Sequence, residues 1–486
     1  MVTLVTADVA RGARADRDRP PELAAPLAIR LARLGRAALR GREEEDTGRQ
    51  ERPGRAAVMA AGAGEDAHAP DRRPLHRDPQ ATGIDRRLVV LLAAACGLTV
   101  ANNYYVQPLL HAISGEFGVG PGAAGLLVTL VQLGYVLGLI FVVPLGDLLD
   151  RRRLVPAILV VTALSLAVAA AAPDLGVLAA AIVVVGLTSV VAQVLVPLVA
   201  SLASAEHRGE LVGSVMTGLM LGTMLSRTFA GLVAQLAGWR AVFAVAALAM
   251  VVLAVVLARH LPAVRPTSSL GYGRLLKSVV ALFVHEPVLR RRALYGAIAF
   301  ALFNLFWTTL AFLLADPPFH FGEAAIGLFA LAAVPAPLAA PRAGRLADRG
   351  HTRALTVACL AVIAVGFLFA LAGRDSLVPL FVAALLISLG VQSLHVTNQS
   401  AIYGLGADNY SRLNSGYMVG YYFGGMTGSA IAATVFAAEG WVGVVVVGFL
   451  VVGLGALVWL VEPGHRLIGS RRIRPRRSPQ DKPQEV

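Results

Sequence analysis

Twelve apolar runs follow one another along the chain, and their lengths constrain its fold more than any other feature. Each run has 18 to 28 residues. A helix of about 20 residues crosses the ~30 Å hydrocarbon core of a bilayer, and a water-soluble domain could not bury so many runs of this length. We therefore predict an all-α polytopic membrane protein with twelve transmembrane helices. The runs are residues 88–112, 123–146, 154–172, 176–203, 211–236, 241–258, 293–315, 324–341, 354–373, 376–403, 413–436 and 440–461.

The longest polar interval between runs divides the helices six and six. It carries seven of the 43 Lys and Arg residues of the chain. We predict an N-terminal six-helix bundle at 88–258, a cytoplasmic central loop at 259–292 and a C-terminal six-helix bundle at 293–461. Residues 462–486 are expected to form a basic cytoplasmic tail.

Residues 1–87 differ in composition from the rest of the chain. They are rich in Arg and acidic residues and have no sustained apolar periodicity. Such a segment cannot bury enough apolar surface to fold. We expect a disordered cytoplasmic extension, with Met59 as the expected natural start.

Basic residues are distributed unevenly about the predicted helices. If both ends are cytoplasmic, 40 of the 43 Lys and Arg residues lie in the tails and the inner loops, as the positive-inside rule requires. We therefore predict a multi-pass protein of the cell (inner) membrane with cytoplasmic N and C termini. This distribution also accounts for the formal net charge of +13, so we expect no nucleic-acid partner.

The two cysteines, Cys96 and Cys359, fall in separate apolar runs. They have neither the pairing of a disulfide framework nor the spacing of metal ligands. A Gly-rich phosphate-binding loop that ends in Lys-Ser or Lys-Thr is also missing. We expect no metal, no cofactor and no ATP hydrolysis; the expected partners of this monomer are the lipid bilayer and a small-molecule substrate.

The two halves of the chain share a repeat. At an offset of 201 residues Asn103 coincides with Asn304, and at 202 Trp239 coincides with Trp441. Because the chain has only four Trp residues, such coincidences favour a duplicated six-helix unit, which is a known way to build transporters. We therefore expect the two bundles to be pseudo-symmetric.

Related motifs follow the second and the eighth run. The first covers residues 144–153, PLGDLLDRRR, and the second covers residues 344–350, GRLADRG. Together with the twelve runs, the repeat and the basic central loop, they resemble the loop motifs of the major facilitator superfamily, over residues 88–461. The resemblance implies the fold of that family and a secondary transporter, not an enzyme, that works by alternating access. The residues to which it assigns a gating role are Asp147, Arg151, Arg152, Gly344, Asp348 and Arg349.

The fifth run carries a partial match to a glycine-rich motif of the antiporter branch of the same family. Gly213, Gly222, Ala230 and Gly231 hold its spacing, but Ser-Arg at 226–227 replaces its Gly-Pro pair. The resemblance favours export of a small organic compound, with protons as the coupling ion. Small residues also allow helices to pack closely, so helix packing remains an alternative explanation of these glycines.

Polar side chains recur at helical spacing inside several runs. A polar group in hydrocarbon costs free energy unless it faces protein or water, so such stripes indicate a cavity. In the tenth run Gln392, His395 and Gln399 follow one another at steps of three and four. The predicted substrate-binding residues are Asn103, Gln107, Gln132, Tyr135, Gln193, Arg227, Asn304, Trp307, Gln392, His395, Gln399 and Tyr421.

Arg227 lies far from either end of its run, where a charge costs ~2.5–3.5 kcal/mol or more. We expect it to face the cavity and meet an anionic group, which leaves uptake of an organic anion, by symport or uniport, as an alternative function. His395 has an unperturbed pKa near neutrality, about 6.5, and is the candidate for proton exchange, although burial and Arg227 both oppose its protonation. An intramembrane lipid-processing enzyme with Asp147 and Asp150 as a metal pair is a less favoured alternative, because the repeat at Asp348 lacks the second acid.

Overall fold

The computed structural model describes residues 85–203, 207–263, 271–405 and 410–462, which all belong to one compact unit, residues 77–486. Every regular element within these ranges is a helix. A helix satisfies its backbone hydrogen bonds internally, as a segment in lipid requires. The predicted all-α membrane fold is therefore confirmed for this part of the chain. The predictions for residues before Asp85 and after Glu462 lie outside the described residues.

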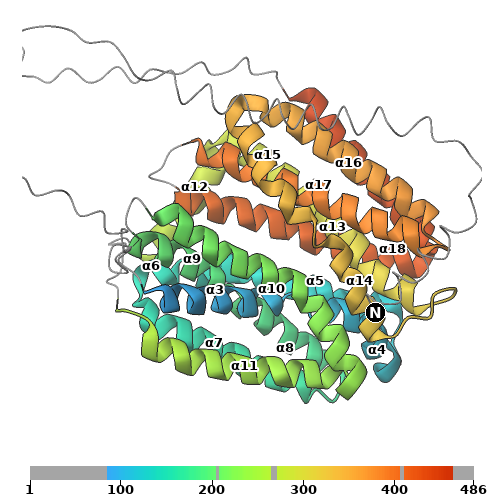
Figure 1. Cartoon of the computed structure of the whole chain (residues 1–486), viewed down its shortest axis with the longest axis horizontal. Helices are drawn as coiled ribbons and strands as arrows, with labels where there is room; N and C mark the ends of the chain where they lie inside the picture. Colours follow the sequence, from blue (N-terminus) through green and yellow to red (C-terminus); the bar gives the residue numbers. More distant parts are fainter. Residues whose placement is uncertain (1–84, 204–206, 264–270, 406–409, 463–486) are drawn as a thin grey trace, which may run out of the picture. The chain divides into compact units, whose positions relative to one another are not determined.

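The N-terminal half, residues 85–263, holds the first six predicted crossings (Figure 1). The first crossing is broken at Asn102, where a turn of four residues precedes the next helix. Pro108 has no backbone N–H, so it is tolerated only near the beginning of that next helix. The elements are α3 (Arg86–Ala101), α4 (Val106–Phe117), α5 (Pro121–Leu137), η2 (Gly138–Val142), α6 (Leu145–Leu148), α7 (Arg151–Ala170), α8 (Leu175–Thr188), α9 (Val191–Leu202), α10 (Arg208–Ala237) and α11 (Trp239–His260).

The C-terminal half, residues 271–462, holds the other six and packs beside the first half (Figure 1). Its elements are α12 (Tyr272–His285), α13 (Pro287–Ala315), α14 (Glu323–Phe329), η3 (Ala330–Ala333), η4 (Ala336–Ala339), α15 (Ala340–Leu346), η5 (Ala347–His351), α16 (Thr352–Ala372), α17 (Leu377–Tyr403) and α18 (Tyr410–Val461).

Ten helical stretches of the described chain are long and apolar enough to cross a membrane. Two of them, at 323–372 and 412–461, have 50 residues each, which would be about 75 Å of straight helix, more than twice the thickness of the hydrocarbon core. Both are broken at a glycine with positive φ, Gly350 (87°) and Gly440 (63°). Each therefore corresponds to two crossings, which brings the ten stretches into agreement with the twelve predicted runs.

Besides the break at Asn102, the structure differs from the prediction in two places. The interval predicted as a loop contains α12, because its apolar residues recur on one face of a helix. The eighth run is not one regular helix but a series of short α and 3₁₀ segments. Pro335, Pro337 and Pro341 interrupt it, since each removes a backbone donor.

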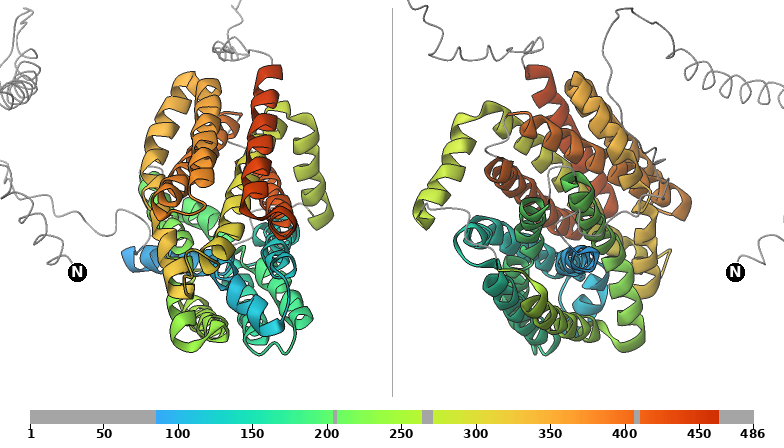
Figure 2. Two further views of the ribbon diagram at one scale, coloured as in Figure 1. Left: turned by 90° about the vertical axis from the view of Figure 1, so that its right-hand side faces the viewer. Right: turned by 60° about the vertical axis from the view of Figure 1, so that its left-hand side comes forward.

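Buried apolar side chains form three clusters. The first draws almost wholly on α3 to α11, and the second draws on α13 to α18. The third joins the halves, with Tyr135 and Val190 packed against Tyr417 and Tyr422. The two views of Figure 2 show the blue-to-green and the yellow-to-red helices lying against each other along this junction.

Glycines let helices within each half approach to backbone contact. A Cβ on Gly222 of α10 would lie 2.1 Å from the carbonyl oxygen of Gly97 in α3, and a Cβ on Gly424 of α18 would lie 2.1 Å from that of Ala297 in α13. Gly213, by contrast, has nothing within 4 Å of such a Cβ. Close helix packing thus accounts for Gly222.

The two halves also touch directly at the end of the unit where α5 and α14 begin, which we call the closed end. A Cβ on Gly231 of α10 would lie 2.2 Å from the carbonyl oxygen of Glu323 in α14. The Thr228 hydroxyl donates to the Gly327 carbonyl over 2.9 Å. Between α5 and α18, the hydroxyl oxygens of Thr129 and Ser429 are 3.0 Å apart.

Candidate functional site

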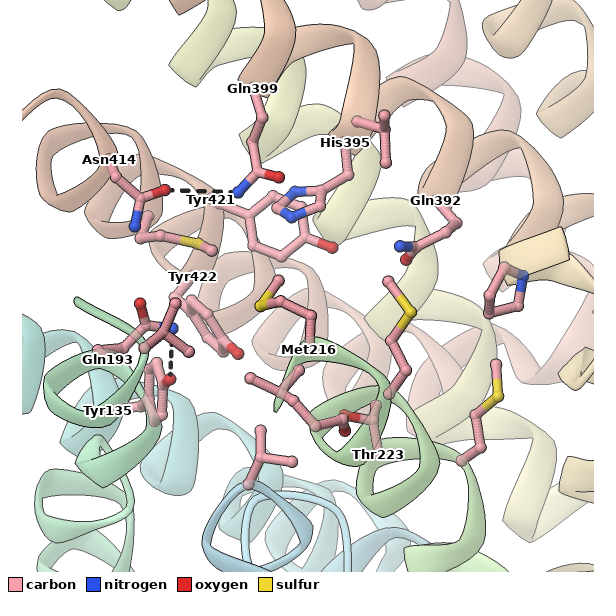
Figure 3. A pocket seen from close by; sticks show the side chains of 18 of the residues that line it. Tyr135, Gln193, Met216, Thr223, Gln392, His395, Gln399, Asn414, Tyr421 and Tyr422 are labelled. Carbon is pink, nitrogen blue, oxygen red and sulfur yellow. Dashed lines mark hydrogen bonds between the residues drawn. The ribbon is translucent and has the colours of Figure 1, made fainter. Parts of the chain in front are cut away.

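A pocket of about 200 Å³ lies between the halves. It lies between the closed end and the opposite end of the unit, at which α9 and α17 finish and α10 begins. Side chains from α3 and the turn after it, α5, α9 and α10 form one wall, and side chains from η4, α17 and α18 form the other (Figure 3). Six predicted residues line it: Tyr135, Gln193, Gln392, His395, Gln399 and Tyr421. The polar stripe of the tenth run therefore does face a cavity.

The polar groups of this pocket are uncharged amides, hydroxyls and one imidazole. Gln399 Nε2 donates to Asn414 Oδ1 over 3.4 Å, and Gln193 Nε2 donates to the Tyr135 hydroxyl over 3.3 Å. No Asp, Glu, Lys or Arg is among the lining residues. The pocket therefore offers hydrogen bonds but no ion pair to a ligand.

Methionines form much of the remaining wall, and they are not among the residues predicted from the sequence. Met216, Met220 and Met224 follow one another at steps of four on α10, and Met418 faces them from α18. The chain has only eight Met residues, so half of them line one pocket. Thioether side chains are flexible and polarisable and adapt to ligands of irregular shape. The M-x₃-M-x₃-M spacing was the available signal in the sequence.

Aromatic rings complete the pocket. The ring centroids of Tyr135 and Tyr422 are 4.1 Å apart, and those of His395 and Tyr421 are 4.6 Å apart. His395 Nδ1 lies 2.9 Å from the Tyr417 hydroxyl, within hydrogen-bond distance. The imidazole is thus held between two tyrosines of α18.

Five of the six other predicted residues lie apart from the pocket, in a buried group that we call the Arg227 cluster: Gln107, Gln132, Arg227, Asn304 and Trp307. Arg227 Nε donates to Gln107 Oε1 over 2.6 Å. Gln107 Nε2 and Gln132 Nε2 each donate to Asn304 Oδ1, over 3.5 and 3.4 Å. Since Asn304 belongs to the C-terminal half, this network joins the two halves.

Arg227 has no acidic partner among the described residues. Its guanidinium carbon lies 4.6 Å from the ring centroid of Tyr104 and 5.0 Å from that of Trp307. Its Nη2 is buried and has no hydrogen-bond partner. Tyr104, whose ring the guanidinium contacts, lines the pocket, whereas Arg227 is not among the lining residues. The expectation that Arg227 faces the cavity stays a prediction.

Asn103 is buried in the turn between α3 and α4, and neither polar atom of its side chain has a hydrogen-bond partner. It lies one helical turn before Gln107 but makes no hydrogen bond to the Arg227 cluster. Of the predicted substrate-binding residues it alone joins neither group.

The predicted gating residues lie at the end opposite to the closed end, where α6 and α15 finish. Arg151 donates to Asp147 Oδ1 over 3.2 Å and to the Gly146 carbonyl over 2.8 Å. Asp348 accepts a hydrogen bond from the Ser400 hydroxyl of α17. Each of these bonds lies within one half. Gly344 is half-buried near α17, and Arg152 and Arg349 are exposed.

Comparison with known proteins adds independent information on this chain. A family model described as Major Facilitator Superfamily matches residues 92–407. The chain is 43% identical over 372 residues to the "Putative uncharacterized transporter YgaY" of Escherichia coli (strain K12), which covers 76% of this chain and 94% of that protein. It is 35% identical over 395 residues to the "Probable transporter SCO4007" of Streptomyces coelicolor, and this match covers 81% of this chain and 91% of that protein.

Among solved structures, the fold is similar to that of a bacterial homolog of the human lysosomal transporter Spinster in an inward-facing, unoccupied conformation. The TM-score is 0.60 at 13% sequence identity, and the match covers 77% of this chain and 95% of that chain. At this identity the likeness concerns the fold alone.

Proposed function

The chain belongs to the Major Facilitator Superfamily and is a membrane transporter, and from that premise we propose that it carries a small organic compound through the pocket by alternating access. The observation that carries the proposal is the position of the pocket. It lies between the two halves, and each half supplies polar, aromatic and thioether groups to it. Rocking two halves about a site at their junction is how such transporters expose it to either side.

We further propose that transport is export coupled to proton antiport. The basic residues predict that the end where α9 and α17 finish is cytoplasmic. The backbone contacts at the closed end then support a state in which the pocket takes its ligand from the cytoplasm. His395 is the proposed proton-exchanging group, since no Asp or Glu is among the pocket-lining residues.

The walls favour a neutral compound with an apolar or aromatic body and a few hydrogen-bonding groups. A cation on the far side of the Tyr104 ring would lie roughly 9 Å from the Arg227 guanidinium, and the repulsion would be about 2 kcal/mol at an effective dielectric constant near 20. A cation–π contact of ~0.5–2 kcal/mol only offsets this repulsion. Cationic compounds should therefore bind less well than neutral ones.

Uptake of an organic anion is the second candidate. The observation that favours it is the buried guanidinium of Arg227, which has no acidic partner in the described chain and one unpaired nitrogen. The same ~2 kcal/mol that opposes a cation would attract an anion. Uptake by uniport would not require a proton gradient, whereas uptake by symport would require a coupling ion.

Purified protein in liposomes tests the proposal. An acidic lumen should drive uptake of a neutral aromatic compound against its gradient, and a protonophore should abolish it. His395→Gln should leave binding within about threefold but reduce gradient-driven accumulation at least tenfold, because the neutral amide cannot exchange a proton. The matched control is His111→Gln, at an exposed position of α4 outside the pocket, which should behave as the native protein.

Two outcomes contradict parts of this proposal. Accumulation of an organic anion, with no response to the pH gradient, would replace export by the second candidate. Full gradient-driven transport by His395→Gln would remove the role of the imidazole while leaving transport through the pocket intact.

Orientation can be tested at the two ends of α16. In a background without Cys96 and Cys359, Arg349→Cys and Arg374→Cys each place a thiol at an exposed position. If the charge distribution sets the topology, an impermeant maleimide should label the position at 374 in intact cells and leave the one at 349 unlabelled. The opposite pattern would reverse the predicted topology.

The same labelling assay tests gating by Asp348, which we propose helps to hold the cytoplasmic side closed. With a reporter thiol from Thr223→Cys in the pocket, Asp348→Asn should raise its labelling rate in inverted vesicles about fivefold, because the charge-assisted hydrogen bond that we propose Asp348 makes to the other half when that side closes becomes a neutral one. Asp375→Asn, at the other end of α16, should leave the rate unchanged. Equal rates in both variants would remove Asp348 from the gate.

A further inference from the structure

A second cavity, of about 390 Å³, lies between the halves and shares no residue with the substrate pocket. Leu139 and Ile140 of η2 line one side of it, Val419 and Phe423 of α18 line the other, and Phe283 of α12 covers it. The side chain of Phe423 is 52% exposed, so the cavity reaches the surface of the unit. It is thus a crevice whose walls come from both halves.

The helix that covers the crevice is amphipathic. Its residues 276, 279, 280, 283 and 284 recur on one helical face and line the crevice. Arg274 and Lys277, one turn apart, are exposed and lie outside this face, with Lys277 at its edge. A helix with one apolar face and a basic polar face is suited to lie at the interface between acyl chains and headgroups. In both views of Figure 2, α12 (yellow-green) stands at the edge of the helices.

Both ends of α12 are held by hydrogen bonds. At its beginning, the Tyr272 hydroxyl donates to the Phe141 carbonyl of the N-terminal half over 2.8 Å. At its end, the Arg290 guanidinium donates to the carbonyls of Phe283 and Val284. The helix is therefore tied to the first half by one end and to α13 by the other, which keeps the crevice covered.

The lining of the crevice excludes water and polar compounds. Ser415 is the one polar side chain among its lining residues. A water molecule needs two to four polar partners to be held in a cavity, and a polar solute would lose its hydrogen bonds to water without replacement. An apolar chain is the occupant that this lining fits.

We propose that the crevice binds an acyl chain of an anionic phospholipid, whose phosphate headgroup lies at Lys277 and Arg274. An acyl chain that moves from the bilayer into the crevice exchanges one apolar environment for another, so the hydrophobic effect contributes little free energy to its binding. The same holds for helices that associate within a bilayer. Selectivity must then come from the headgroup, and the two exposed basic residues at the rim supply it by charge complementarity. The lipid would contact both halves at once.

The test uses the purified full-length chain in detergent, with phosphatidylglycerol and phosphatidylcholine of the same acyl chains as probes, and measures binding by native mass spectrometry and by the midpoint of thermal unfolding. Phosphatidylglycerol should bind about thirtyfold more tightly, since each basic residue near an anionic headgroup contributes about fivefold. The double substitution Arg274→Gln, Lys277→Gln should lower phosphatidylglycerol affinity to that of phosphatidylcholine. Arg259→Gln, at an exposed arginine in the last turn of α11, should change neither affinity.

A second pair of variants tests the crevice itself. Val419→Phe, which fills the crevice, should reduce binding of both lipids at least tenfold, whereas Val446→Phe, at an exposed position of α18 beyond the break at Gly440, should not. Glycerol phosphate, which has the headgroup charge and no chains, should bind at least a hundredfold more weakly. Equal affinity for the two lipids, or glycerol phosphate bound as tightly as the lipid, would overturn the proposal. So would a loss of substrate binding in Val419→Phe with lipid binding intact.

Discussion

Gly222→Ala is expected to remove most of the folded protein from detergent extracts of the membrane. The added Cβ would lie 2.1 Å from the Gly97 carbonyl oxygen and 2.4 Å from its Cα, and both atoms are backbone that no rotamer change can move. The helices α3 and α10 must then separate along their crossing. Overpacking costs typically ~1–3 kcal/mol, and we expect the upper end of that range, which is a factor of roughly 150 in the folded-to-unfolded ratio.

Gly213→Ala on the same helix is the matched control, because a Cβ there meets nothing within 4 Å. Helix propensity alone would make this variant slightly more stable. Size-exclusion yield and the unfolding midpoint report both variants. In the C-terminal half, Gly424→Ala and Gly453→Ala form the corresponding pair. A Cβ on Gly424 would lie 2.1 Å from the Ala297 carbonyl oxygen, whereas a Cβ on Gly453 would meet nothing within 4 Å. A Gly222→Ala variant as stable as Gly213→Ala would contradict the described crossing.

Arg227→Gln is expected to lower transport turnover by one to two orders of magnitude at a normal level of folded protein. The shorter amide side chain cannot reach Gln107 Oε1, to which Arg227 Nε donates over 2.6 Å. A buried hydrogen bond to a charged group contributes about 1.5–3 kcal/mol. Gln107 in turn donates a hydrogen bond to Asn304 across the junction of the halves. Loss of the Arg227–Gln107 hydrogen bond should therefore change how the halves close. Initial rates in proteoliposomes measure the effect.

A matched pair of ligands, one anionic and one neutral, separates two roles for Arg227. An equal loss for both ligands would assign it to positioning the halves, and a further tenfold loss for the anion would assign it to anion binding. Arg240→Gln is the control, since Arg240 pairs with Glu116 at a partly exposed site where an ion pair contributes ~0–1 kcal/mol. Native rates in Arg227→Gln for both ligands would contradict both roles.

Much of the fold could be predicted because the number and length of the apolar runs determine how often the chain crosses the membrane. The apolar runs mark the crossings, and Asn103 with Asn304 marks the repeat. The helix α12 was missed because Arg274 and Lys277 make the interval polar on average, while its apolar residues share one face only in helical geometry. The break at Asn102 was missed because the run around it is continuous in hydropathy.

The site was predicted in part, and for a physical reason. A polar stripe indicates which side chains face the interior of a bundle, but not what stands between them. Arg227 contacts the ring of Tyr104, which lines the pocket, but Arg227 is not itself a lining residue, and the spacing of residues in the sequence does not reveal this. The methionines of α10 were missed because they count as apolar in any hydropathy pattern, although M-x₃-M-x₃-M places them on one face of the helix.

The contacts at the closed end have a consequence for the cost of parting the halves. Gly231 and Gly327 meet there through backbone atoms, and Gly125 meets the Cβ of Ala433. Side chains as short as these have no rotamers to immobilise, whereas ordering a long side chain costs up to ~2 kcal/mol of entropy. A contact surface built from Gly and Ala can therefore separate and form again with little change in side-chain entropy, whereas a surface of long side chains would have to order them each time it formed.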